Sequence, residues 1–333
     1  MQAYGAVAVE PWHVKYVPVD VPEPGPDDVV IKVTHSWISN GTEGSFVRGE
    51  RIAGDTPRAD TDPQPFPHIS GYQKVGVVQS VGANVDHLTP GESAFATVSR
   101  VSGLFYDHGG HVSPAVTHKS QVWPLPKGLD PVAASGLVLT QVGYNVGMCG
   151  EVGPGDLAIV IGDGMVGHWT AQTLQHRGAR VLMLGRHDYR LDLFSTRDGD
   201  RRLNTANGLN IQSVRDWADG ANRIQYVADT VGSVPTIYEL LGEMRQFGSI
   251  ASAGFYGANG MIDIQRLRQR ENSLFAPAGW SKSRMDSTLS LLADGALTTK
   301  HLITHRFPVE EADKAFDLIL SKSDKVLGVI LDW

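Results

Sequence analysis

The chain has 333 residues, a formal net charge of −7 and a single cysteine, Cys149. Its length allows two domains with a core in each. There is no basic stretch, no long apolar run and no N-terminal signal pattern. We therefore expect a soluble, cytoplasmic protein that acts on a small molecule and binds neither nucleic acid nor a membrane.

The first part of the chain predicts a β-barrel. Short strand-like runs alternate with proline and glycine, which is typical of an all-β domain. The runs are 29–33, 75–81 and 92–96, and the proline-rich segment 56–67 predicts a long loop. The segment 131–139 has the pattern of a helix.

A glycine-rich turn in the middle of the chain predicts a dinucleotide site. The charge-free apolar run Leu157–Ile161 predicts a buried parallel strand, and Gly162-Asp163-Gly164-Met165-Val166-Gly167 follows it. Gly162 allows the tight turn, Gly164 lets backbone N–H groups approach a pyrophosphate, and Gly167 lets the next helix lie close to the sheet. The alternative is an ordinary glycine-rich turn between a strand and a helix.

The next expected strand, 180–184, ends on Gly185 and Arg186. An NAD site places Asp or Glu there to accept from the ribose 2′-OH, whereas an arginine accommodates the 2′-phosphate of NADP. Arg186, followed by His187 and Arg190, therefore predicts NADP(H) as the cofactor. The alternative is that Arg186 is a solvated loop residue.

The rest of the sequence continues this alternation of strands and helices. We expect further strands at 224–229, 249–254, 302–306 and 326–331, and helices at 168–177, 235–245, 285–292 and 309–321.

Several segments resemble motifs of the medium-chain dehydrogenase/reductase superfamily. Gly71–Val78 stands where the superfamily has its Gly-His-Glu strand, Trp123–Leu129 where its domains join, and Ala253–Gly257 where a turn flanks the nicotinamide. Within the superfamily, parts of 35–43, 302–306 and 330–333 are similar to the bacteriochlorophyllide a dehydrogenase family, which oxidises a hydroxyethyl side chain to acetyl.

The resemblance implies an α/β fold in two domains. It implies a GroES-like β-barrel catalytic domain at 1–139, a Rossmann domain with a doubly wound parallel sheet at 140–275, and a return segment at 276–333 that completes the catalytic domain. It also implies a homodimer. The cofactor contacts that it implies beyond the glycine turn are at Thr230, Gly254, Phe255 and Tyr256.

The sequence departs from zinc-dependent members of the superfamily at both matching ligand positions. Asn40 and Tyr72 replace a cysteine and a histidine, and one cysteine is too few for the four-cysteine structural lobe. We therefore expect chemistry without zinc. The remaining ligand-like cluster, 107–111 with His118 beyond it, is better explained as a turn with structural or solvated histidines.

Without zinc, a carbonyl oxygen must be stabilised by hydrogen-bond donors. The resemblance gives Thr42 the place of the superfamily's proton-relay hydroxyl, and we expect Thr42, Tyr72 and Asn40 to be catalytic donors. Glu43 matches an acid behind the ligands and is expected to orient a donor or relay a proton. The alternatives are that Thr42 caps the following helix, that Tyr72 belongs to the core and that Asn40 shapes the turn.

Trp37 and Trp280 are the expected substrate-pocket residues. The bulky Trp37 would narrow the pocket, which argues against a tetrapyrrole and favours a smaller secondary alcohol such as a sugar, a cyclitol or a specialised metabolite. The alternative is that Trp37 is a core residue.

The sequence thus predicts a zinc-independent oxidoreductase that transfers hydride between NADP(H) and a secondary alcohol/ketone pair. Two alternatives stay open. One is the NADPH-dependent reduction of activated C=C bonds in enones or quinones, and the other is a non-catalytic NADPH-binding sensor.

Overall fold

The computed structural model describes the chain except for Asp55, residues 257–259 and Asp324. The described residues form two compact units. The first unit comprises Met1–Val138 and Thr298–Trp333, and the second comprises Leu139–Leu297. Over the described residues, no helix is long and apolar enough to cross a membrane.

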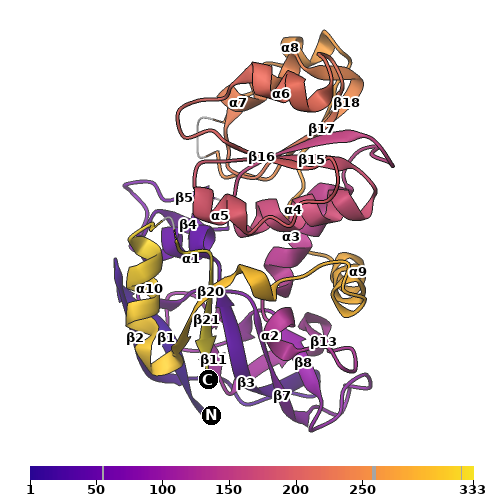
Figure 1. The fold of residues 1–333 in the computed structure, drawn as a ribbon. Helices are drawn as coiled ribbons and strands as arrows, with labels where there is room; N and C mark the ends of the chain where they lie inside the picture. The colour runs from indigo at the N-terminus through magenta and orange to yellow at the C-terminus, as the bar shows by residue number, and fades with distance from the viewer. Residues whose placement is uncertain (55, 257–259, 324) are drawn as a thin grey trace. The chain divides into compact units, whose positions relative to one another are not determined.

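The first unit is built on a seven-stranded sheet in the order β13-β8-β7-β3-β21-β20, with β12 also paired to β3 (Figure 1). Its strands are β3 (Asp28–Ile38), β7 (Lys74–Val81), β8 (Ser93–Ala96), β12 (Ala115–His118), β13 (Val122–Pro124), β20 (Ile303–Pro308) and β21 (Gly328–Asp332). A second sheet contains β1 (Gln2–Glu10), β2 (His13–Asp20), β6 (His68–Ile69) and β11 (Val112–Ser113). Apolar side chains from both sheets share one core, which includes Val7, Ile31 and Val78.

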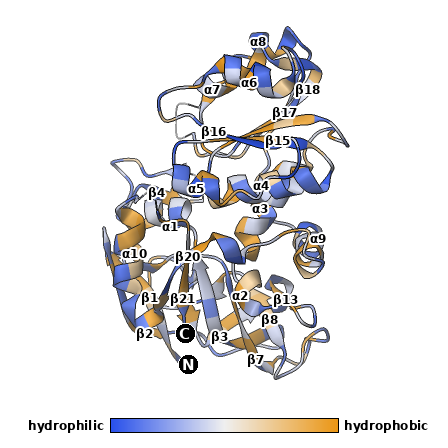
Figure 2. Ribbon diagram, viewed as in Figure 1, coloured by the Kyte–Doolittle hydropathy of each residue, from blue (hydrophilic) through white to orange (hydrophobic). Residues whose placement is uncertain are grey.

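The helices of the first unit include α1 (Asn40–Val47), α2 (Pro131–Ala134) and α10 (Ala312–Leu320). Helix α10 buries Ala312, Ala315, Phe316 and Ile319, a spacing that places all four on one helical face. Figure 2 shows hydrophobic and hydrophilic residues together on this helix. The apolar face packs with Val329 and Leu331 of β21, so the last helix and the last strand share a core with the N-terminal hairpin.

The second unit has a six-stranded parallel sheet in the order β16-β15-β14-β17-β18-β19. Its strands are β14 (Leu157–Ile161), β15 (Arg180–Gly185), β16 (Arg201–Asn204), β17 (Ile224–Asp229), β18 (Met244–Ser252) and β19 (Ser273–Phe275). Counted along the chain, this order is third, second, first, fourth, fifth, sixth, which is that of the doubly wound dinucleotide-binding fold. The expected fold class, a β-barrel domain plus a Rossmann domain, is confirmed.

The helices that accompany this sheet are α3 (Leu137–Met148), α4 (Met165–His176), α5 (Asp188–Asp192), α6 (Ile211–Ala218), α7 (Val234–Leu241), α8 (Ile264–Arg268) and α9 (Lys282–Ala293). The strands β14 and β17 have the expected bounds: β14 is a continuous apolar run, and both strands are buried along their whole length.

Three expected elements differ in the structure. The expected helix 131–139 is divided into α2 and α3 near Gly136, where an added Cβ would lie 2.8 Å from Cε3 of Trp37. The expected helix 235–245 ends at Leu241, and β18 begins at Met244, whose side chain is fully buried. Residues 276–297, expected in the return segment, belong to the second unit.

Candidate functional site

The glycine turn of the second unit has the geometry that its three glycines predict. Gly162 has a φ of 122°, and a Cβ there would lie 2.4 Å from Oγ1 of Thr230. A Cβ on Gly167 would lie 2.1 Å from the carbonyl oxygen of Gly162, so α4 packs closely on the turn. In contrast, a Cβ on Gly164 would meet nothing within 4 Å. The turn therefore leaves open space at the N-terminus of α4, next to Met165 and Val166, where a pyrophosphate fits.

Asp163 belongs to the glycine turn, and its side chain lies at the end of β15, a placement that the sequence analysis did not predict. Its side chain is 8% exposed and accepts hydrogen bonds from the backbone N–H groups of Arg186 at 2.7 Å and His187 at 2.8 Å. It also contacts Nδ1 of His187 at 2.9 Å and Nη1 of Arg190 at 3.9 Å. A Cβ on Gly185 would lie 2.6 Å from Asp163, so glycine is needed for this approach. A carboxylate is thus present at the strand end, but the turn itself uses it.

The three basic residues that follow Gly185 differ in whether Asp163 binds their side chains. His187 and Arg190 are held by Asp163, whereas Arg186 is exposed, and within the described part of the chain its guanidinium makes no ion pair. Arg186 is therefore the cation that is available to an external anion.

A second turn of this unit surrounds Asp229, at the end of β17. The buried carboxylate accepts from the N–H groups of Val231, Gly232 and Ser233, and from the Tyr256 hydroxyl at 2.6 Å. Burial and this hydrogen bond to Asp229 raise the pKa of Tyr256. Tyr256 therefore holds a proton firmly and serves to anchor its turn.

The other expected cofactor residues lie close to this turn. Thr230 donates to the carbonyl of Ile161 at 2.8 Å, and a Cβ on Gly254 would lie 1.9 Å from the backbone nitrogen of Gly232. Phe255 is exposed. Gly257, the last residue of the expected motif, lies outside the described residues.

In the first unit, the expected catalytic residues gather at the start of α1. Tyr72 makes side-chain hydrogen bonds with Ser39 and Thr42. Burial raises the pKa of Tyr72 to about 12, with the nearby charge of Glu43 acting in the same direction. Thr42 and Tyr72, which lie 30 positions apart in the sequence, are thus brought into contact.

Asn40 differs from expectation. Its Nδ2 donates to the carbonyl of Leu327 at 2.6 Å, and its Oδ1 is buried without a hydrogen-bond partner among the described residues. The amide nitrogen that was expected to donate to a substrate therefore anchors α1 to the segment before β21. The unsatisfied atom is an acceptor, which cannot stabilise a developing oxyanion.

Glu43 is buried and accepts three hydrogen bonds. Its Oε1 accepts from the backbone N–H of Ser39 at 2.7 Å, and its Oε2 lies 3.1 Å from Oγ of Ser70 and 2.7 Å from Nε2 of His111. Glu43 therefore orients the start of α1. His111 was grouped by sequence with a turn cluster, and its pairing with Glu43 was missed because 68 positions separate the two residues.

The remaining histidines of that cluster are elsewhere. His108 is exposed and contacts Asp107, and His118 is exposed and caps a short 3₁₀ helix. Across the residues that the structure describes, no group of three or more His, Cys, Asp and Glu side chains converges as a metal site.

The expected pocket role of Trp37 is wrong. Its side chain is 0% exposed, and it fills space that a Cβ on Gly136 or on Gly328 would enter, at 2.8 Å and 2.6 Å. Trp37 is thus a core residue, held between two glycines. Trp280, the other expected pocket residue, lies partly exposed in the second unit just before α9.

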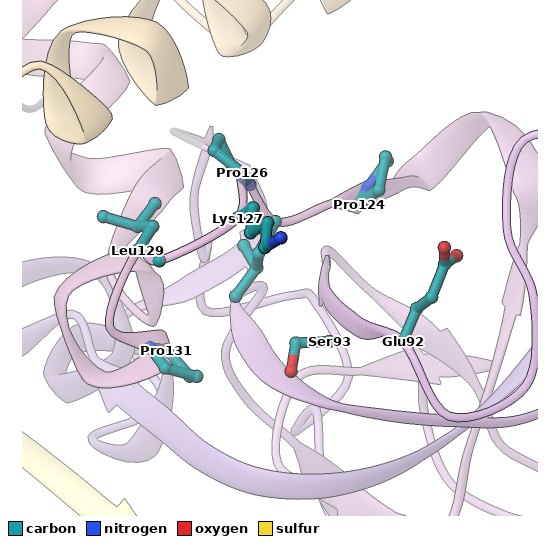
Figure 3. A pocket seen from close by; sticks show the side chains of 9 residues that line it. Glu92, Ser93, Pro124, Pro126, Lys127, Leu129 and Pro131 are labelled. Carbon is teal, nitrogen blue, oxygen red and sulfur yellow. The ribbon is translucent and has the colours of Figure 1, made fainter.

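A surface pocket of 280 Å³ also lies in the first unit, between the end of β13 and the residue before β8 (Figure 3). Pro124, Pro126, Lys127 and Glu92 are among its lining residues. None of the expected catalytic residues lines it.

Comparison with known proteins gives relatives along the whole chain. The 2-desacetyl-2-hydroxyethyl bacteriochlorophyllide A dehydrogenase of Rhodobacter capsulatus is 26% identical over 320 residues, which cover 93% of this chain and 92% of that protein. Among solved structures, a dehydrogenase from Sinorhizobium meliloti 1021 bound to NADP has a TM-score of 0.83, with 18% identity and full coverage of both chains. An alcohol dehydrogenase from Escherichia coli CFT073, complexed with NADH, has a TM-score of 0.84, with 19% identity and coverage of 100% of this chain and 99% of that chain. No protein-family model matches the chain.

These relatives support the placing of the chain in the medium-chain dehydrogenase/reductase superfamily, a class of oxidoreductases.

Proposed function

We propose that the protein is a zinc-independent oxidoreductase that transfers hydride between NADP(H) and a secondary alcohol/ketone pair. The observation that carries this proposal is the contact between Tyr72 and Thr42 at the position where a zinc-dependent relative would hold its metal. Two hydroxyl groups there can donate to a carbonyl oxygen as negative charge develops on it. The relatives support the reaction class, since those described above are dehydrogenases.

A nicotinamide cofactor supplies or accepts the hydride when it is bound. The open space at Gly164 fits its pyrophosphate, and the solved relatives were bound to NADP or NADH. The exposed guanidinium of Arg186 favours NADP(H), because it can clamp a 2′-phosphate with two hydrogen bonds. Asp163 is satisfied by backbone and side-chain donors, so it does not compete as an acceptor for a ribose hydroxyl.

In this proposal, side chains of the protein donate the proton that the ketone oxygen receives during reduction. With a pKa raised to about 12, Tyr72 is protonated at neutral pH and can donate to a ketone oxygen. Thr42 makes a side-chain hydrogen bond with the Tyr72 phenol. Ser39 also makes a side-chain hydrogen bond with the phenol. We do not assign catalysis to Asn40, because its amide nitrogen is bound to Leu327.

The cofactor preference is tested with Arg186→Ala and with Arg223→Ala as a matched control, since Arg223 is also exposed in the second unit. Arg186→Ala should weaken NADPH binding by roughly 1.5 to 3 kcal/mol, the usual contribution of hydrogen bonds to a charged group. NADH binding, and NADPH binding by the control, should barely change in calorimetric titrations. Equal affinity of the parent protein for NADH and NADPH would contradict the preference.

The reaction itself is tested by assaying a panel of ketones and enones with NADPH, on protein whose zinc content has been measured. We expect ketone reduction without stoichiometric zinc. Reduction of enones alone would favour a C=C reductase, and cofactor binding without turnover of any compound would favour a sensor. One zinc per chain, with activity lost to a chelator, would remove the zinc-independent mechanism.

A further inference from the structure

A network of side-chain hydrogen bonds connects Glu43, in the first turn of α1, to Trp333. From Glu43, the contact with Nε2 of His111 continues through Nδ1 of His111 to Oγ of Ser36, at 2.8 Å. Nε1 of Trp333 donates to the same serine oxygen at 2.9 Å. The side chains of Glu43 and His111 are 1% and 0% exposed, so water does not compete for this pair.

The pair lies against the backbone that leads into Tyr72. Gly71 has a φ of 87°, and a Cβ there would lie 2.7 Å from Nε2 of His111 and 3.1 Å from Oε2 of Glu43. Gly110, the residue before His111, packs closely against Tyr72, because a Cβ on Gly110 would lie 2.5 Å from the backbone nitrogen of Tyr72. The position of His111 is therefore coupled by direct packing to the position of Tyr72.

The same pair also fixes the residues that contact the Tyr72 phenol. Glu43 binds the N–H of Ser39, the residue that precedes α1, and Ser39 and Thr42 both make hydrogen bonds with Tyr72. Without a donor from His111, the buried Glu43 carboxylate keeps, among the residues that the structure describes, the hydroxyl of Ser70 and the N–H of Ser39. A buried carboxylate that loses a partner moves or admits water, and the groups bound to it move with it.

We propose that His111 is a positioning residue of the oxidoreductase site: by holding Glu43 against Ser39 and Gly71, it fixes the Tyr72 hydroxyl beside Thr42. This inference rests on the proposed function, in which Tyr72 and Thr42 act on the carbonyl oxygen. His111 itself does not touch the substrate, because it is fully buried behind Gly71.

The test compares three substitutions in the full-length protein. His111→Leu removes the donor to Glu43, and His111→Gln keeps an amide N–H that can reach it. His108→Leu is the matched control, because His108 lies in the same segment but is exposed, and its Nδ1 contacts the exposed Asp107 instead of Glu43. For each protein, kcat and KM for a ketone, the Kd for NADPH, and hydrogen exchange of the peptides containing Ser39 and Gly71 are measured.

For His111→Leu we expect kcat to fall by about tenfold to a hundredfold, as losses of supporting hydrogen bonds in active sites do. KM and the NADPH Kd should stay near the parent values, and exchange should accelerate at Ser39 and at Gly71. His111→Gln should recover most of kcat, and His108→Leu should match the parent. If His111→Leu does not fold, His111→Asn takes its place, because the shorter amide does not reach Glu43.

Parent-like kcat in both His111 variants would overturn the proposal. A loss that His111→Gln does not recover, together with faster exchange throughout the first unit, would also overturn it, because His111 would then only support the fold. If the parent protein reduces no ketone, the proposed function fails, and exchange at Ser39 and Gly71 alone decides whether His111 positions them.

Discussion

Lys74 in β7 gives a quantitative prediction about stability and pH. Its side chain is 0% exposed, and its ammonium group donates to the carbonyl of Thr97. Burial lowers the pKa of Lys74 from 10.5 to about 7. Each pKa unit corresponds to about 1.4 kcal/mol, so a difference of about 3.5 units corresponds to about 5 kcal/mol.

The sign follows from proton binding. Between pH 7 and 10.5 the unfolded chain keeps Lys74 protonated while the folded protein releases the proton, so the free energy of unfolding rises with pH in this window. At pH 7 and below, nearly the whole penalty is present. Lys74→Met nearly conserves the volume and removes the amine, although it also leaves the Thr97 carbonyl unpaired at a cost of about 1 to 2 kcal/mol. We therefore expect Lys74→Met to stabilise the first unit by about 3 kcal/mol at pH 7.

Urea unfolding of the parent and of Lys74→Met at pH 7, 8.5 and 10 measures this difference. The advantage of the variant should shrink steadily as pH rises, and it should vanish or reverse near pH 10 because the parent then releases its penalty. A variant that is less stable than the parent at pH 7, or a difference that does not depend on pH, would refute the reasoning about Lys74.

Two further predictions concern the glycine turn of the second unit and the two hydroxyl groups of the first unit. Gly164→Ala should fold normally, because the new Cβ meets open space, but it should bind NADPH at least about tenfold more weakly. Gly167→Ala should instead destabilise the second unit by about 1 to 3 kcal/mol, because its Cβ would overlap the carbonyl oxygen of Gly162. Thermal melts and NADPH titrations distinguish these outcomes, and equal effects of the two substitutions would contradict the geometry of the turn. Tyr72→Phe and Thr42→Val should each lower turnover by about a hundredfold to a thousandfold with an unchanged Kd for NADPH, the effect of Thr42→Val being the larger. Turnover at the parent level in both correctly folded variants would remove these hydroxyls from the mechanism.

The sequence predicted those parts of the fold whose physical cause is local. The strand Leu157–Ile161 and the glycines after it could be identified because a buried parallel strand needs an apolar run, and the turn needs residues without a Cβ. The hairpin of β1 and β2 was missed, because its strands mix small, charged and aromatic residues. Gly5 in β1 shows the reason: a Cβ there would lie 2.7 Å from Cδ1 of Ile69, a strand neighbour 64 positions away.

The same distinction holds for the site. Thr42 and Tyr72 could be singled out by resemblance, but the partners that hold them come from distant parts of the chain. Asp163 was visible only as a variable position inside a glycine motif, and its function depends on a strand end more than 20 positions later. Trp37 was misjudged because its surroundings, Gly136 and Gly328, are remote in sequence.

The pairing of β21 with β3 has a consequence for the order in which the protein is completed during synthesis. The second unit is one continuous segment, so all of its residues have been made once Leu297 has been added. The sheet of the first unit still lacks β20 and β21 at that stage, and β21 is an inner strand because it lies between β3 and β20. Val329, Ile330 and Leu331 of this strand are fully buried. We therefore expect a chain cut short by its last few residues to expose the core of the first unit and to leave the second unit intact. Such a truncated chain is a candidate for recognition by chaperones and proteases, although it keeps every residue of the glycine turn.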